Sequence, residues 1–169
     1  YSIRHDIAVA VGRQGLEEYL IEYGPLGNNG KGQKRALREY VLGLADRSGE
    51  GSSGYVAVVS SALVKDAFDE NRPNEDLAKC QGCKETIIDD FGTDKKPLCA
   101  ATMRSLTGGN TITGHGKHEK GLNIDTDFLL RLIVNTFPAY DVQLSEPDMR
   151  RMCVIYYPCT FKPPDSYDN

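Results

Sequence analysis

Several features are absent from this sequence, and each absence removes a class of protein. No apolar run approaches the ~18 residues that indicate a membrane-spanning helix. The longest run, from Phe128 to Val134, is interrupted by Arg131. Basic residues are not in excess, because 20 Lys and Arg face 24 Asp and Glu and leave a net charge of −4. We therefore expect no membrane span, and the charge balance disfavours a nucleic-acid partner.

Signals for glycosylation and for an initiating methionine are also missing. No Asn-x-Ser/Thr sequon occurs, and the sequence starts at Tyr1. We interpret this start as the product of processing, because maturation, polyprotein cleavage and tag removal all leave such an end. We favour maturation, because the chain also carries five cysteines. This combination predicts a secreted or extracellular protein, with a cytoplasmic location as the alternative.

The composition that remains is that of a folded domain. Of the 169 residues, 40% are hydrophobic and 26% are charged. A chain of this length buries roughly 70% of the surface that its unfolded form exposes, so it needs neither a metal nor a disulfide to be stable. We expect one globular domain over residues 1–169.

The apolar periodicity predicts a helix-rich protein. Alternating apolar residues predict a strand over 3–11. Residues typical of strands predict two more, one over 55–59 that is central and buried and one over 152–157. Helical spacing predicts helices over 16–23, 36–44, 62–68, 74–91, 97–106 and 126–137, of which 74–91 could be two short helices. Ser145 and Asp148 predict a capping box that starts another helix. The fold class is α/β or α+β, a small sheet of a few strands flanked by several helices.

The cysteines allow three chemistries. Cys80 and Cys83 form a C-x-x-C motif, but the absence of a preceding strand disfavours a redox pair. Zinc could be held by Cys80, Cys83, Cys99 and His118. We favour structural disulfides, of which at most two can form, since a bridge from the motif to Cys99 would close a loop of ~15 residues and contribute ~3 kcal/mol. Buried free thiols are the remaining alternative. The disulfide candidates are Cys80, Cys83, Cys99, Cys153 and Cys159.

A glycine-rich segment over 107–122 is the candidate for chemistry or anion binding. Its anion-binding candidates are Gly114, Gly116, Lys117 and Lys120. A hydrolytic site could use His115 or His118 as the base and Glu119 as the carboxylate that orients it. The segment is not a standard phosphate loop, since Thr111 stands where the first glycine belongs. A solvated surface loop is the alternative.

A second basic group could meet phosphate or an acidic partner. It consists of Lys31, Lys34, Arg35 and Arg38, on the expected helix that follows the loop at 27–30. The solvated face of an amphipathic helix is the simpler interpretation.

These observations favour a processed, secreted interaction protein of the effector or toxin type, supported by disulfides and associated with virulence. Its expected partner is another protein. One alternative is a hydrolase or transferase that uses residues 107–122 on an anionic substrate. The other is a zinc-containing binding module released from a longer precursor.

Overall fold

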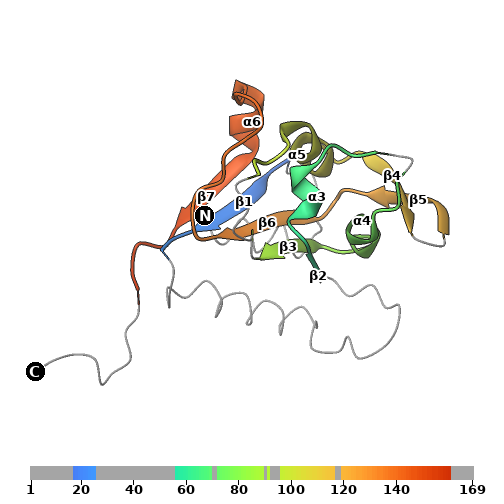
Figure 1. The fold of residues 1–169 in the computed structure, drawn as a ribbon, viewed down its shortest axis with the longest axis horizontal. Helices are drawn as coiled ribbons and strands as arrows, with labels where there is room; N and C mark the ends of the chain where they lie inside the picture. Colours follow the sequence, from blue (N-terminus) through green and yellow to red (C-terminus); the bar gives the residue numbers. More distant parts are fainter. Residues whose placement is uncertain are drawn as a thin grey trace, which may run out of the picture.

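The computed structural model describes residues 17–25, 56–69, 72–89, 91, 96–116 and 119–160, with the backbone alone at 114–116 and 119–122. The expected strand at 3–11, the expected helix at 36–44 and the basic residues from Lys31 to Arg38 lie outside these ranges. Within them, five parallel strands form one sheet in the order β2-β3-β6-β1-β7, and two antiparallel strands form a hairpin (Figure 1).

The sheet strands are β1 (Tyr19–Tyr23), β2 (Val56–Val59), β3 (Glu85–Asp89), β6 (Leu129–Val134) and β7 (Met152–Tyr156). The hairpin consists of β4 (Thr111–Gly116) and β5 (Glu119–Asp125). The described helices are α3 (Ala62–Lys65), α4 (Glu75–Lys79), α5 (Ala100–Thr107) and α6 (Glu146–Arg151). The helix-rich prediction is therefore wrong, since the described chain is sheet-rich and its helices are short.

Two segments that were expected to be helical are the inner strands β1 and β6. All six residues of β6 are buried, and so are the first four of β1. A parallel strand that is covered on both faces shows a continuous apolar run instead of alternation. Such a run also places apolar residues at helical spacing, so periodicity alone does not separate the two structures.

The expected helix over 74–91 is a short helix followed by a strand. Asn74 caps α4 as expected, and its Oδ1 accepts a hydrogen bond from the backbone N–H of Leu77 at 2.9 Å. The helix ends at Lys79, and Gly82 adopts a positive φ of 71°. Glycine tolerates this conformation without strain, so the chain turns there and enters β3.

Other expectations are confirmed, with changes in position. The two predicted strands form as β2 and β7, although β2 lies at an edge of the sheet and not at its centre. Helix α6 starts at the predicted capping box, where the Asp148 carboxylate accepts a hydrogen bond from the backbone N–H of Ser145 at 3.0 Å. Helices α3 and α5 are shorter than expected or displaced.

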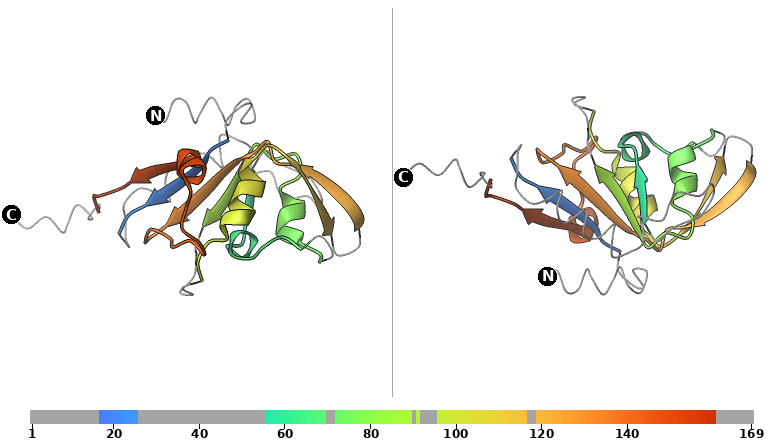
Figure 2. Two further views of the ribbon diagram at one scale, coloured as in Figure 1. Left: turned by 90° about the horizontal axis from the view of Figure 1, so that it is seen from above. Right: turned by 90° about the horizontal axis from the view of Figure 1, so that it is seen from below.

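The main core lies between the sheet and α3, α4 and α5, which cover the same face (Figure 2). Side chains of β1, β2, β3 and β6 from this face meet Leu63, Leu77 and Met103 of the helices. Helix α4 contacts β2 on one side and the hairpin on the other. The hairpin thus extends the molecule beyond the β2–β3 end of the sheet.

No cysteine is in a disulfide. Cys80, Cys83, Cys99 and Cys153 are buried thiols and Cys159 is an exposed one, and none of the five is bonded to another. The disulfide prediction is therefore wrong. The four buried thiols pack in the protein interior as small apolar side chains. Among the described helices, none has the length and apolarity to cross a lipid bilayer.

Candidate functional site

The carboxyl edge of the parallel sheet brings together three segments that can carry chemistry. Sheets of this kind bind ligands outside the carboxyl ends of their strands, where the sequence order of the strands is broken. Here the order is broken at β1, which is inserted between β6 and β7. Gly24 follows β1 directly, Asp89 ends β3, and Asn135 follows β6.

The register of the strands aligns these three residues. Tyr23 pairs with Val134, so Gly24 and Asn135 are the next residues along two neighbouring strands. Asp89 pairs with Ile133 on the other side of β6. Adjacent strands lie ~4.8 Å apart, so Asp89 stands about 10 Å from β1. Gly24 is buried, Asp89 is half-buried and Asn135 is exposed.

The sequence that leaves β1 is rich in glycine and reaches a lysine. It reads Gly-Pro-Leu-Gly-Asn-Asn-Gly-Lys-Gly from Gly24 to Gly32. Glycines allow backbone N–H groups to converge on an anion, and a lysine adds a positive charge. Lys31 and the glycines after Pro25 lie outside the described residues, so their part in the site comes from the sequence alone.

A buried ionic group lies beneath this edge. The guanidinium of Arg131 in β6 pairs with the carboxylates of Glu22 in β1 and Glu85 in β3. At most 2% of any of these three side chains is exposed. Leaving a buried charge without its partner is costly, so the pairs tie the three adjacent strands together in one register. Glu22 lies two residues before Gly24.

The predicted site over 107–122 has a different shape from the expected loop. Most of it is the hairpin, with a register shift between Gly114 and Gly116. His115 lies in β4, Glu119 and Lys120 lie in β5, and Lys117 and His118 are outside the described residues. The glycine-rich composition predicts a loop, whereas the structure has two strands, β4 and β5, in this segment. The catalytic and anion-binding roles of these residues stay predictions, because no described contact tests them.

The two cysteines of the C-x-x-C motif directly follow α4 in the chain and are buried. The thiol of Cys80 donates to the carbonyl of Asp76 at 3.3 Å, and that of Cys83 donates to the carbonyl of Lys79 at 3.2 Å. Burial raises the pKa of the Cys80 thiol to about 12. The zinc set of Cys80, Cys83, Cys99 and His118 stays a prediction, because His118 lies outside the described residues. In the part of the chain that the structure describes, no three Cys, His, Asp or Glu residues gather to hold a metal.

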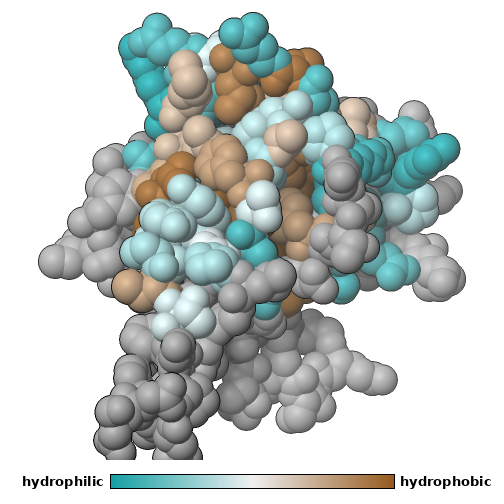
Figure 3. Space-filling view, turned by 60° about the vertical axis from the view of Figure 1, so that its left-hand side comes forward, coloured by the Kyte–Doolittle hydropathy of each residue, from teal (hydrophilic) through white to brown (hydrophobic). Residues whose placement is uncertain are grey.

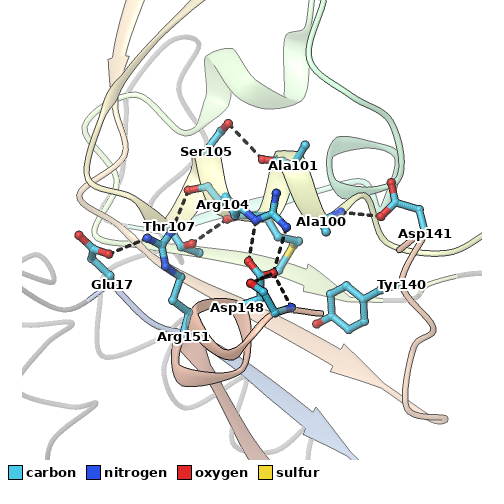
Figure 4. Close-up of polar contacts among 12 residues, drawn as sticks. Glu17, Ala100, Ala101, Arg104, Ser105, Thr107, Tyr140, Asp141, Asp148 and Arg151 are labelled. Carbon is cyan, nitrogen blue, oxygen red and sulfur yellow. Dashed lines mark hydrogen bonds and ion pairs between the residues drawn. The ribbon is translucent and has the colours of Figure 1, made fainter. Parts of the chain in front are cut away.

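A second polar group joins α5 and α6 near the amino ends of β1 and β7 (Figure 4). Arg104 donates to both oxygens of Asp148, at 2.6 and 2.9 Å. These bonds, with help from Ser145, hold the pKa of the Asp148 carboxyl far below its ordinary value. Arg151 pairs with Glu17 at 2.8 Å. Because these charges satisfy one another, the group fastens α5, α6 and the start of β1 together.

Two tyrosines lie beside this group. The hydroxyls of Tyr19 and Tyr140 are 2.7 Å apart, and burial raises the pKa of both phenols. Both side chains therefore stay neutral at physiological pH. They contribute packing and a hydrogen bond rather than acid–base chemistry.

Comparison with known proteins supports the fold only. No protein-family profile and no curated protein sequence matches the chain. Among solved structures, the fold is similar to the apo C-terminal region of NrS-1 in its A form, with a TM-score of 0.56 and 15% sequence identity. The similarity covers 84% of this chain but 29% of the solved chain, so this chain spans less than a third of that solved region's length.

These findings correct the functional prediction. A secreted effector supported by disulfides is wrong, because its main support, the disulfides, is absent and the structural neighbour gives no support to it. Nothing in the fold indicates virulence. The extracellular location, the protein partner and the single domain are not tested and stay predictions.

The sequence contained a signal that was missed. A glycine-rich segment ending in a lysine indicates phosphate binding only when a strand feeds it. The helical spacing over 16–23 predicts a helix and not a strand, so the sequence alone indicates an ordinary loop at Gly27 to Gly30 and places Lys31 on a basic helix face. Once 19–23 is known to be a strand, the segment stands in the correct context.

Proposed function

We propose that this protein binds the phosphates of a nucleoside triphosphate at the carboxyl edge of β1, β6 and β3. The observation that carries the proposal is the position of Gly24. It starts a glycine- and lysine-containing segment directly after a parallel strand, at the edge where Asp89 also ends its strand. In phosphate-binding loops a strand feeds such a segment, whose backbone N–H groups hold the phosphates while its lysine neutralises them.

The segment departs from the standard phosphate loop in two ways. The standard spacing is Gly-x4-Gly-Lys, whereas five residues separate Gly24 from Gly30 here. The Ser or Thr that normally follows the lysine and contacts Mg²⁺ is replaced by Gly32. The first difference changes the length of the cradle but not its chemistry. The second removes a metal ligand and leaves more of the metal contact to carboxylates.

Asp89 is the described carboxylate at this edge. In related arrangements an aspartate at the end of a neighbouring strand holds the Mg²⁺ that accompanies the triphosphate. Mg²⁺ bound with a nucleotide needs only one or two protein carboxylates, because phosphates and waters complete its shell. Asp90 follows directly in the sequence and offers a second carboxylate.

Calorimetric titration with ATP and Mg²⁺ tests the proposal. Replacing Lys31 by Ala removes the charge nearest the phosphates, and we expect affinity to fall by about tenfold or more, as for other charge-assisted contacts. Lys34→Ala is the matched control, because it removes the same charge three residues later and is expected to leave the affinity unchanged.

Two results would count against the proposal. One is equal affinity of the wild-type protein and the Lys31→Ala variant. The other is an equal loss in the two lysine variants, which would indicate attraction by overall charge rather than a phosphate cradle.

A further inference from the structure

Three aromatic side chains gather beside the proposed phosphate site. Tyr23 is the last residue of β1 and Tyr156 is the last residue of β7, and the two are register partners. Phe137 lies three residues after the end of β6. The backbone N–H of Tyr157 still donates to the carbonyl of Tyr23 at 2.9 Å, so the sheet is intact up to this edge. We call Tyr23, Phe137 and Tyr156 the aromatic trio.

The trio is ordered within itself. The rings of Tyr23 and Tyr156 are stacked, with centroids 4.7 Å apart and an interplanar angle of 30°. Phe137 meets Tyr23 edge-on, with centroids 5.7 Å apart and an angle of 80°. Both are preferred geometries for aromatic pairs. The rings are therefore held by one another and by two strand ends.

Two members of the trio are nevertheless open to solvent, whereas Tyr23 is partly buried. Tyr156 is 54% exposed and Phe137 is 42% exposed, and Val154, two residues earlier on the same face of β7, is 41% exposed. Figure 3 turns the side of the molecule that carries β7 toward the viewer, where brown apolar side chains are exposed between paler and teal ones.

The position of the trio limits what can occupy it. Tyr23 directly precedes Gly24, so the trio adjoins the point where the glycine-rich segment leaves the sheet, and a group attached to the bound phosphates can lie beside these rings. In a nucleotide that group is the ribose followed by the base. Bases stack on aromatic side chains whatever their sequence identity, because each base has a π face.

We propose that the aromatic trio is a stacking platform for the nucleobase of the bound nucleotide, with Tyr156 presenting the open ring face. This inference rests on the proposed phosphate site. If the aromatic trio binds the base, the affinity for the nucleotide has two separable parts, one from contacts to the phosphates and one from stacking of the base.

Paired ligands test this separation. ATP carries both parts, whereas inorganic tripolyphosphate carries the phosphates alone. Stacking is worth ~1–3 kcal/mol per base by alanine substitution, so Tyr156→Ala should weaken ATP binding by about 5- to 150-fold. The same variant should bind tripolyphosphate as the wild type does. Tyr156→Phe keeps the ring and should retain ATP binding. Val142→Ala, at a residue that is 52% exposed, is the control for loss of exposed apolar surface.

The outcomes distinguish the two proposals. If the wild type binds neither ligand, the phosphate site itself is refuted. If the wild type binds both with equal affinity, or if Tyr156→Ala weakens both equally, the stacking platform is refuted while the phosphate site stands. A variant that loses self-association in sedimentation but keeps ATP affinity would identify the trio as a protein interface instead, and would also overturn the platform.

Discussion

Arg131 and Glu22 form an ion pair that is buried between adjacent strands, directly below the edge where β1 gives way to the glycine-rich segment. A second carboxylate, that of Glu85, reaches the same guanidinium from β3. One cation thus links the strand that feeds the proposed phosphate segment to the strand that ends in Asp89. The alignment of the candidate site depends on this link.

Replacing Arg131 by an uncharged residue should strongly destabilise the fold. Arg131→Met would leave two buried carboxylates without their partner, and we expect a loss of about 3–5 kcal/mol in the free energy of unfolding, measured in urea. Replacing both glutamates by Leu in the same variant should restore part of this loss, because no buried charge then remains. Arg150→Met is the control, since that side chain is 75% exposed and its pair contributes little. A loss no larger than that of the control would mean that the pairs do not hold the strands.

Acid should weaken the contact between α5 and α6. Bonds from Arg104 lower the pKa of Asp148, so its stabilising effect is complete above the pKa of the unfolded chain, about 4. It is lost as the pH falls further, through the lowered pKa of the folded state. The stability difference between wild type and Asp148→Asn should be constant from about pH 5 upward and shrink below about pH 4.

The Asp148→Asn experiment has a matched control on the same helix. Glu146 is 71% exposed and pairs only across the surface with Arg150. Glu146→Gln should show a small difference from wild type throughout. If the two variants give the same pH profile, the Arg104–Asp148 contact does not account for the acid sensitivity.

Periodicity identified elements whose signals are local, and it failed where distant pairing decides. Asn74 and Ser145 cap helices through contacts a few residues away, so both helix starts were predictable. Whether β1 and β6 form strands depends on neighbours more than a hundred residues apart in the sequence. Arg131 looked like an interruption of an apolar helix because its two glutamate partners are remote.

The candidate site was missed for the same reason. The segment from Gly24 to Lys31 is glycine-rich and ends in a lysine, but this pattern indicates phosphate binding only when a strand precedes it. Asp89 comes near this segment only because β1 and β3 both pair with β6. The histidines, lysines and glycines of residues 107–122 favoured that segment as the candidate site instead. Most of that segment is a hairpin, in which Thr111 to Gly114 of β4 pair with Leu122 to Asp125 of β5.

The free thiols give a direct check of the corrected cysteine chemistry. Under denaturing, non-reducing conditions we expect all five thiols to react with a disulfide reagent. In the native protein Cys159 should react rapidly, and Cys80 should react slowly because burial raises its pKa to about 12. Fewer than five reactive thiols after denaturation would restore the disulfide hypothesis.

Asp89 should govern the metal dependence of nucleotide binding. Asp89→Asn should remove the gain in ATP affinity that Mg²⁺ provides, while affinity measured with a chelator stays unchanged. Asp127→Asn is the control, because Asp127 lies at the opposite edge of the sheet, just before β6, and pairs with Lys84. If Mg²⁺ still strengthens binding to the Asp89→Asn protein as it does to the wild type, the metal is held elsewhere.

Hydrogen exchange of the backbone amides with and without Mg²⁺ and ATP locates the ligand most directly. Phosphates held by backbone N–H groups must slow exchange in peptides that cover residues 24–32. The hairpin over 111–125 should exchange at the same rate in both samples. Protection confined to the hairpin, or no protection in 24–32 at saturating nucleotide, would contradict the assignment of the site to the carboxyl end of β1.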